Sequence, residues 1–388
     1  MARFLTPYEL DEIYGVLEDR TYPLPTELQS NFSTVINFET ETIDLDKIAP
    51  DLRIGIFVAP EQNAKPTASR GYSTKVFYPG YWKDKATVDF RNLRKRRAGQ
   101  QLSTPTSNAG KIARAVQDNL ELLDSKRMRL MEWMASEVLV YGRYGIQSER
   151  HPLVEVDMEP YIATHLTSNG QTATGVPATQ GVALNSGRAN RANISGTNVT
   201  HPITGQVFPT LGSNREWGGT SDTPVADLQE MLNAAWEPIR KIYMSDNAWA
   251  ALLTDTDFST LIDTTKSTMS TFNVDLLPKQ QTIEGLKLRG VIGAQNIPII
   301  TYNAEYQPTT ATTLTKYLAN GWVVMVPDAS YGIQAFGAVQ HGLADFRSTE
   351  VFWNSWIEDE GGKPWLQGQS APIFLHTKIN STVAWKVM

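Results

Sequence analysis

One uninterrupted helix-forming stretch places the strongest constraint on the fold of this chain. Residues 111–141 contain no glycine or proline, and apolar side chains recur along them at spacings of three, four or seven residues. This apolar face consists of Ile112, Val116, Leu120, Leu123, Leu130, Met134, Val138 and Tyr141. With a start near Thr106, after Pro105, and a stop at Gly142, the pattern predicts one helix of about 37 residues, roughly 55 Å long.

The opposite face of this predicted helix is polar. It carries Lys111, Arg114, Asp118, Glu121, Asp124, Arg129 and Glu132. A coiled coil is the alternative for so long a helix, but the apolar spacing drifts from a strict heptad and no second comparable helix follows. The pattern therefore favours a single helix that packs on the rest of the chain.

The segment before the helix is rich in residues that favour strands. Its β-branched and aromatic members are Tyr72, Thr74, Val76, Phe77, Tyr78, Tyr81, Trp82, Thr87, Val88 and Phe90. Pro79-Gly80 lies between them and predicts a bend, so residues 70–90 are expected to form an extended hairpin. An isolated hairpin is marginal in water, so we expect this arm to lie on something else, such as another subunit.

A basic neck joins the predicted hairpin to the helix. It contains Arg91, Arg94, Lys95, Arg96 and Arg97. Such a run can bind a phosphate backbone, or its guanidinium groups can pair with carboxylates on neighbouring subunits. The net charge of −6 argues against a general nucleic-acid binder, so the neck favours subunit contacts.

Composition bounds the class of protein. A length of 388 residues predicts about two or three domains, and 41% hydrophobic with 20% charged residues is ordinary for a globular protein. The ten tryptophans favour buried aromatic contacts, and they also suit a carbohydrate-binding surface. Cysteine is absent, so disulfides, thiolate metal sites and a cysteine nucleophile are excluded. No apolar run is long enough to span a membrane, and no signal-peptide core is visible, so synthesis in the cytoplasm is expected.

Motifs that carry catalysis are not found. The five histidines are scattered, and no HExxH, GxSxG, GxxxxGK[ST] or GxGxxG pattern occurs. The acidic run Glu358, Asp359, Glu360 lacks the alternating spacing of a calcium loop and is typical of a solvated turn. The sequence therefore predicts no catalytic residue, no cofactor, no metal site and no enzyme activity.

The rest of the chain alternates between helices and strands. Strands are expected near residues 33–38, 52–59, 153–158, 284–302, 322–326, 331–339, 371–378 and 382–388, and helices at residues 7–19, 225–244 and 245–253. Residues 159–222 are rich in Gly, Thr, Asn and Ser, which suits a flexible linker or a small β-rich insertion. The terminal strands are expected to pair with residues 153–158 and cover the long helix. The class is α+β.

Several blocks of the sequence together resemble the major capsid protein E family of lambda-like tailed phages. They are RGYSTKVFYPGY, the neck, the long helix, VEVDM, DNAWAALL, VVMVPDASYGIQAFGAVQ and QSAPIFLHTKINSTVAWKV, and they follow the family's order. The resemblance implies a Hong Kong 97-type capsid fold. Its expected parts are an N-terminal arm (1–50), an extended E-loop (51–100), a spine helix with the first peripheral strands (101–158), a surface β-rich insertion (159–222), an axial domain (223–345) and a return to the peripheral domain (346–388).

The function implied by the resemblance is assembly. The chain is expected to form pentamers and hexamers of an icosahedral shell that encloses double-stranded DNA, with a scaffolding protein, a portal and a decoration protein as partners. The shell would be part of the virion and would assemble in the bacterial cytoplasm. Contacts between subunits are expected at Arg70, Lys75, Tyr78, Tyr81, Trp82, Arg91, Arg94, Arg96 and Arg97. Lys83 and Lys85 lie in the E-loop, but no dedicated cross-linking partners can be identified. The alternatives are a cellular nanocompartment shell of the same fold and a Trp-rich glycan-binding or glycan-cleaving protein.

Overall fold

The computed structural model describes most of the chain. The described residues are 26–48, 61, 63, 72–87, 108–148, 151–159, 165–167, 170–172, 190–195, 198–205, 207–208, 216–219, 222–258, 272–274, 285–292, 296–308, 313–358 and 364–388. The expected helix at residues 7–19, the expected strand at 52–59 and the neck at 91–97 lie outside them.

A seven-stranded sheet forms the core of one lobe. In spatial order its strands are β13 (Phe272–Val274), β14 (Leu286–Ile292), β15 (Ile297–Tyr302), β12 (Lys241–Met244), β18 (Trp322–Val326), β23 (Val383–Lys386) and β9 (Arg191–Asn193). The pairs β12–β15 and β9–β23 are parallel, and the other pairs are antiparallel. The last strand of the chain therefore lies inside this sheet, next to β18.

Two helices pack on this sheet, α4 (Pro224–Ala234) and α5 (Asp246–Thr254). The Ser245 side chain caps α5 by accepting a hydrogen bond from the Ala248 N–H. The helix expected over residues 225–244 is wrong in its second half, because Pro238 cannot continue a helix and residues 241–244 are strand β12. Leu228 and Met231 pack with Trp385 in the apolar core beneath these helices.

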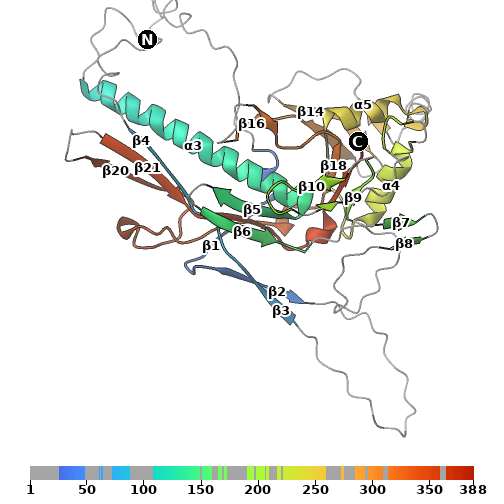
Figure 1. The fold of residues 1–388 in the computed structure, drawn as a ribbon, viewed down its shortest axis with the longest axis horizontal. Coiled ribbons are helices and arrows are strands. Elements are labelled where there is room, and N and C mark those ends of the chain that lie inside the picture. The colour runs from blue at the N-terminus through green and yellow to red at the C-terminus, as the bar shows by residue number, and fades with distance from the viewer. Residues whose placement is uncertain are drawn as a thin grey trace, which may run out of the picture.

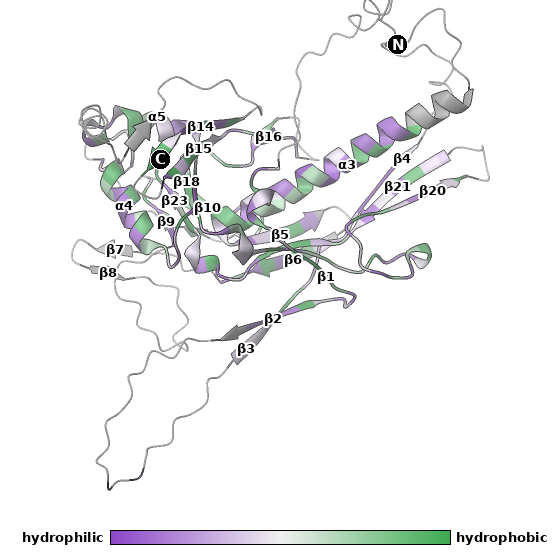
Figure 2. Cartoon of the chain, turned by 180° about the vertical axis from the view of Figure 1, so that it is seen from behind, coloured by the Kyte–Doolittle hydropathy of each residue, from purple (hydrophilic) through white to green (hydrophobic). Residues whose placement is uncertain are grey.

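The long helix is confirmed as α3 (Asn108–Tyr141), and Figure 1 shows it running along the edge of the second lobe. The Gly142 N–H donates to the Val138 carbonyl oxygen over 3.0 Å, and Gly142 has a φ of 70°, which is the left-handed C-terminal stop expected from the sequence. Hydrophilic and hydrophobic bands alternate along the helix in Figure 2. Its C-terminal part is buried far beyond one face, since Leu139 and Val140 are buried as well as Val138.

Three smaller sheets surround α3. They are β20 (Phe352–Ile357), β21 (Pro364–Ser370) and β4 (Trp82–Thr87); β1 (Thr34–Asn37), β19 (Gly332–Phe336) and β22 (Pro372–His376); and β5 (Arg143–Ser148) with β6 (His151–Asp157). Three short pairs are β7 (His165–Thr167) with β8 (Gly170–Thr172), β10 (Val199–Thr200) with β11 (Val207–Phe208), and β16 (Glu305–Tyr306) with β17 (Thr315–Lys316). The Asp84 carboxylate of β4 pairs with the Lys126 ammonium of α3 at 2.9 Å.

The expected hairpin at residues 70–90 is wrong, although both of its strands exist. Strand β3 (Tyr72–Phe77) pairs with β2 (Ile43–Ile48), whereas β4 pairs with β21. The chain therefore crosses from one sheet to another at Pro79-Gly80. Gly80 suits the crossing because a Cβ there would lie 2.8 Å from Ile146 Cδ1.

The expected pairing of residues 153–158 with the terminal strands is also wrong. Strand β6 pairs with its immediate predecessor β5, while β22 pairs with β19 and β23 pairs with β18 and β9. Ser148 pairs with His151, so only two residues separate the paired strands, and closing so short a connection has a small entropic cost. The strands β22 and β23 still lie near α3, in two different sheets.

The surface insertion expected at residues 159–222 is wrong for residues 190–195, which lie in the core, whereas β10 and β11 later in the same stretch form a short pair that is partly exposed. Strand β9 is fully buried in the seven-stranded sheet, and Arg191 is 0% exposed. Its guanidinium donates to the carbonyl oxygens of Asn190, Leu139 and Thr382, so it caps the C-terminal turn of α3. Burial lowers the pKa of Arg191 to about 9. This segment thus joins the long helix to the central sheet.

We predict that Gly332→Ala destabilises the subunit by about 2 kcal/mol or more, as overpacking of a dense region does. A Cβ at position 332 would lie 2.4 Å from the Asn31 carbonyl oxygen and 2.8 Å from the Phe32 Cα, so backbone would have to move. Urea unfolding of the unassembled subunit measures the change. The control is Gly342→Ala, where a Cβ meets nothing within 4 Å; equal stability of the two variants would contradict the prediction.

Candidate functional site

A two-stranded ribbon projects from the body of the molecule. Figure 1 shows β2 and β3 leaving the two lobes together, with Ile43 opposite Phe77 at the base and Ile48 opposite Tyr72 at the outer end. Phe77 is buried in the core, but Tyr72 is 72% exposed. The described residues give the outer part of the ribbon no apolar support, so it is suited to contact another molecule.

Short polar contacts stiffen the ribbon. The Thr74 hydroxyl donates to the Asp46 carboxylate over 2.6 Å across the two strands. Lys75 forms an ion pair of 3.1 Å with Glu159, beside the ribbon base, and its ammonium lies 5.9 Å from the centre of the Phe77 ring. Lys75, expected to contact another subunit, is therefore already engaged within its own chain.

The expected contact residues fall into three groups. Tyr78 is 52% exposed and remains free to contact another molecule. Arg70, Arg91, Arg94, Arg96 and Arg97 lie outside the described residues. Tyr81 and Trp82 are half-buried within their own chain, and their expected contact with another subunit stays a prediction.

Tyr81 and Trp82 are held by the β4–β21–β20 sheet and the loop above it. The Tyr81 hydroxyl donates to Gln369 Oε1 at 2.5 Å and accepts from the Gln340 N–H at 3.1 Å, and burial raises its pKa. The Trp82 ring meets the Trp353 ring edge to face at 6.4 Å. The sequence could not reveal these contacts, because the partners lie more than 250 residues away along the chain.

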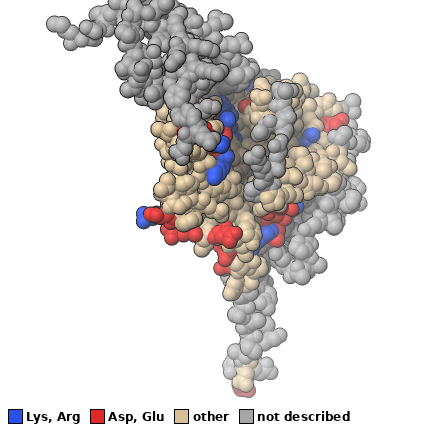
Figure 3. Space-filling view, turned by 60° about the vertical axis from the view of Figure 1, so that its left-hand side comes forward, with Lys and Arg blue, Asp and Glu red and all other residues tan. Residues whose placement is uncertain are grey.

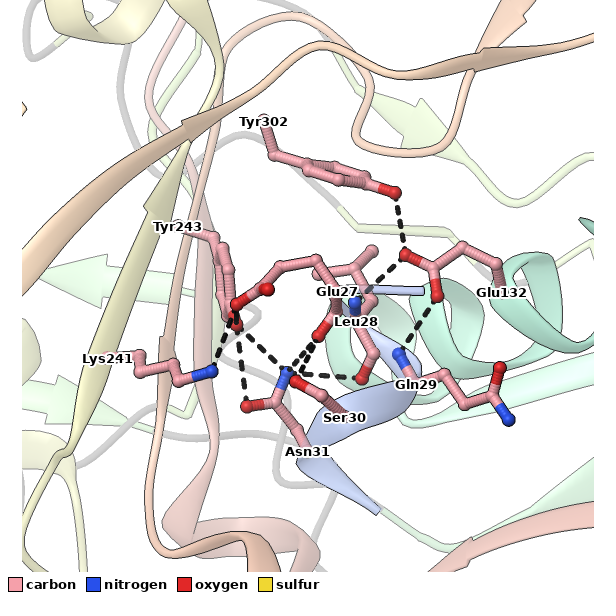
Figure 4. Close-up of polar contacts among 9 residues, drawn as sticks. All are labelled: Glu27, Leu28, Gln29, Ser30, Asn31, Glu132, Lys241, Tyr243 and Tyr302. Atoms are coloured by element: carbon pink, nitrogen blue, oxygen red, sulfur yellow. Dashed lines mark hydrogen bonds and ion pairs between the residues drawn. The ribbon is translucent and has the colours of Figure 1, made fainter. Parts of the chain in front are cut away.

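A buried polar network anchors the chain where it enters the body. Residues 29–31 form a short 3-10 helix, η1 (Gln29–Asn31), and Figure 4 shows the Glu132 carboxylate of α3 pointing at its first residues. Glu132 Oε1 accepts from the Leu28 N–H at 2.9 Å and from the Tyr302 hydroxyl at 2.6 Å, and Oε2 accepts from the Gln29 N–H at 2.9 Å. One carboxylate therefore joins the arm, the long helix and strand β15.

Glu132 was expected on the polar face of the helix, but it is fully buried. Burial raises the pKa of Glu132, and the hydrogen bonds from Tyr302, Gln29 and Leu28 oppose that rise. A signal for this site existed in the sequence. The last ten residues of the helix, Glu132–Tyr141, are apolar nearly all round, which is typical of a helix buried on every side.

A second set of contacts fixes the arm to strand β12. Glu27 Oε1 accepts from the Tyr243 hydroxyl at 2.8 Å and pairs with the Lys241 ammonium at 2.9 Å. The Asn31 amide donates to the Tyr243 oxygen at 3.1 Å. Burial and the nearby Glu27 charge raise the pKa of Tyr243, so this hydroxyl stays protonated and acts as a donor.

Acidic side chains gather where the ribbon leaves the body. Figure 3 shows red side chains at this position, and Glu39, Glu41, Asp44 and Asp46 are all exposed on the segment that enters β2. We call these four residues the acidic base. Negative potential here favours a cationic partner surface.

His201 and His376 are buried within the subunit. His201 Nε2 lies 2.6 Å from the Glu137 carboxylate, and its Nδ1 accepts from the N–H groups of Ile203 and Thr204. Burial raises the pKa of Glu137 and lowers that of His376 to about 3. Among the described residues no group of three or more acidic or histidine side chains could hold a metal ion. No helix in this part of the chain is long and apolar enough to cross a membrane.

Comparisons with known proteins point to one family. Residues 10–208 and 199–387 match the family model described as Phage major capsid protein E. The chain is 23% identical over 371 residues to the major capsid protein of Enterobacteria phage P21, which covers 94% of both proteins. It is 26% identical over 148 residues to the major capsid protein of Escherichia phage lambda, which covers 38% of this chain and 43% of that protein.

A solved structure shares the fold. A crystal structure described as the capsid protein of a prophage of Escherichia coli CFT073 superposes with a TM-score of 0.61, at 17% identity and with 98% and 97% of the two chains covered. The long helix beside mixed sheets, with an extended ribbon, is thus a Hong Kong 97-type capsid fold, as the sequence predicted.

We predict that Glu132→Gln destabilises the unassembled subunit by about 1–3 kcal/mol. A glutamine keeps one acceptor but places its NH₂ group against the N–H of Leu28 or Gln29, so a buried donor loses its partner. Urea unfolding at neutral pH measures the loss. Glu121→Gln, on the exposed face of the same helix, is the control, and an equal effect in both variants would show that the buried network contributes nothing.

Proposed function

The chain belongs to the phage major capsid protein E family, and we propose that it is the major capsid protein that builds the icosahedral shell around the double-stranded DNA of a tailed phage. The observation that carries the proposal is a family match that spans residues 10–387, together with the capsid fold. Its place is the virion capsid. The chemistry required is self-association, for which a subunit needs extended surfaces and no catalytic group.

The ribbon is the element best suited to reach a neighbouring subunit. Tyr72 and Tyr78 expose large aromatic surfaces, and Val76 lies between them. Aromatic side chains contribute strongly to interfaces because they bury much apolar area at a small entropic cost. We assign the ribbon as a strap that lies on an adjacent subunit, where these side chains become buried. A closed shell repeats each such contact many times, so modest interfaces suffice.

The acidic base offers a partner for the basic neck of an adjacent subunit. Four exposed carboxylates lie at residues 39–46, and the neck supplies four arginines and one lysine within residues 91–97. Arginine binds carboxylates in a bidentate geometry. The charge of the neck is therefore assigned to subunit pairing, and contact with the genome is its alternative.

We propose the predicted division of the chain with two changes. The arm includes residues 1–42, and the extended loop begins at β2, since Ile43–Ile48 is a strand of the ribbon. The spine helix and first peripheral strands (101–158), the axial domain (223–345) and the peripheral return (346–388) keep their proposed limits. Residues 190–208 are assigned to the axial domain, because β9 extends its sheet.

A major capsid protein is expected to bind other proteins of the virion. We assign to this chain a scaffolding protein, a portal and a decoration protein, assembly in the bacterial cytoplasm and no enzyme activity. The family match favours a shell protein over the glycan-binding alternative, and of the tryptophans Trp217, Trp322 and Trp385 are fully buried in the core. Electron microscopy of the expressed full-length chain tests the main proposal: closed shells support it, and a monomer at assembly concentrations contradicts it.

We predict that Tyr72→Ser with Tyr78→Ser prevents shell assembly while the unfolding free energy of the subunit changes by no more than about 0.5 kcal/mol. Both side chains are more than half exposed, so they contribute little within the subunit. Trp82→Ala is the opposite case, since its ring packs on Trp353, and it should lower subunit stability. Sedimentation velocity and urea unfolding separate the two effects; normal assembly of the tyrosine variant would refute the strap.

We predict that Arg94→Glu with Arg96→Glu blocks assembly in the absence of DNA. Each substitution replaces attraction to the acidic base with repulsion. Co-assembly with Glu39→Arg and Glu41→Arg subunits should restore shells, because the reversed charges then match. A variant that assembles normally and fails only to retain DNA would instead assign the neck to the genome.

A further inference from the structure

A loop tip with two exposed apolar side chains lies between β19 and β20, on the side of the β4–β21–β20 sheet away from α3 (Figure 1). We define it as residues 341–347, the tip loop. Leu343 is 73% exposed, the highest value among the large hydrophobic residues that the structure describes, and Phe346 is 61% exposed. Two such side chains close together on one loop mark a contact surface.

Hydrogen bonds within the tip loop fix its conformation. His341 Nδ1 accepts from the Leu343 N–H at 3.1 Å, the Arg347 N–H donates to the Ala344 carbonyl oxygen at 3.0 Å, and the Val339 N–H donates to the Arg347 carbonyl oxygen at 3.1 Å. The His341 ring also packs on Phe352 of β20, with ring centres 5.2 Å apart. These bonds fix the loop before any partner arrives, so binding costs little conformational entropy.

The backbone of the tip loop is strained in a way that turns Phe346 outward. Asp345 and Phe346 have φ angles of 51° and 54°, in the left-handed region. This conformation is rare for a bulky side chain, because the Cβ crowds the backbone, and it costs conformational energy. Because Phe346 is exposed, its contacts within the subunit offset almost none of this strain. Burial of the ring against another molecule would offset it.

The charges of the tip loop identify the partner. Asp345 and Arg347 lie 4.0 Å apart at their charged atoms, and their side chains are 76% and 74% exposed. The tip therefore presents one acid and one base beside Leu343 and Phe346. A patch of this kind is complementary to itself, because a two-fold rotation places the base of one copy against the acid of the other.

We propose that the tip loop docks on the tip loop of a second copy of this chain. The contact joins Leu343 and Phe346 of both copies in one apolar centre and exchanges the Asp345–Arg347 pairing between them. It rests on the proposed function, since a shell protein must bind copies of itself, and it adds a named contact that is separate from the ribbon.

Charge reversal tests the proposal by rescue. Asp345→Lys makes the tip doubly positive and Arg347→Glu makes it doubly negative, so each variant alone should need an assembly concentration about tenfold higher than the natural chain. An equimolar mixture should assemble at a lower concentration than either variant alone, because unlike tips then meet. If the mixture gives no improvement, or if both single variants assemble like the natural chain, self-docking is overturned.

A cysteine cross-link gives a direct measure of proximity. The chain contains no cysteine, and a Cβ at Gly342 meets nothing within 4 Å, so Gly342→Cys is accommodated. Oxidised shells of this variant should show disulfide-linked dimers on non-reducing electrophoresis. Leu314→Cys, beside β17, measures cross-linking by collision. Shells of Gly342→Cys that give no more dimer than this control overturn the proposal.

Phe346→Gly separates docking from folding. Glycine adopts a positive φ without strain, so subunit stability should be equal or higher while the assembly concentration rises about tenfold. Unchanged assembly would overturn the docking role. The natural chain is included in every assay: if it forms no shell, the proposed function fails, whereas shells of the natural chain with unaffected tip variants contradict the tip loop alone.

Discussion

The buried carboxylate of Glu132 is the interaction on which the arrangement of the subunit depends. It accepts from two backbone N–H groups of the arm and from the Tyr302 hydroxyl of the central sheet, while its own backbone belongs to the long helix. A buried charge is costly unless every lone pair finds a donor. Because the donors come from the arm and from β15 while the carboxylate comes from α3, the cost of burial is offset only when all three elements are in place.

A second buried charge contacts the helix at its C-terminal turn, close to Glu132. Arg191 is a buried cation that donates to carbonyl oxygens, one of them the Leu139 oxygen in the last turn of α3. A positive group is favourable at a helix C-terminus. The long helix is therefore linked to the seven-stranded sheet at two points of opposite charge: Glu132 is contributed by the helix and Arg191 by the sheet.

Local patterns allowed much of the fold to be predicted. The long helix was predicted from its periodicity and observed at Asn108–Tyr141, and the expected strand at residues 322–326 and helix at 245–253 are observed as β18 and α5. The pairing of β4 with β21 could not be predicted, because no local sequence pattern around Trp82 indicates that it pairs with Ser370. Composition also misled at residues 190–195, where Asn, Arg and Ser are buried by hydrogen bonds that only the fold supplies. Of the candidate contact residues, Tyr78 is exposed, whereas Tyr81 and Trp82 are half-buried by contacts within their own chain that the sequence did not predict.

The crossing at Pro79-Gly80 has a mechanical consequence. Because β3 and β4 are not partners, a pull on the ribbon passes through this short crossing into β4 and is directed along that strand. The six residue pairs between β4 and β21, from Thr87 with Trp365 to Trp82 with Ser370, then bear the load in shear and share it. A hairpin would instead have opened one pair at a time. Because β3 and β4 pair with different strands, tension on the ribbon would be transmitted to the body of the subunit through β4.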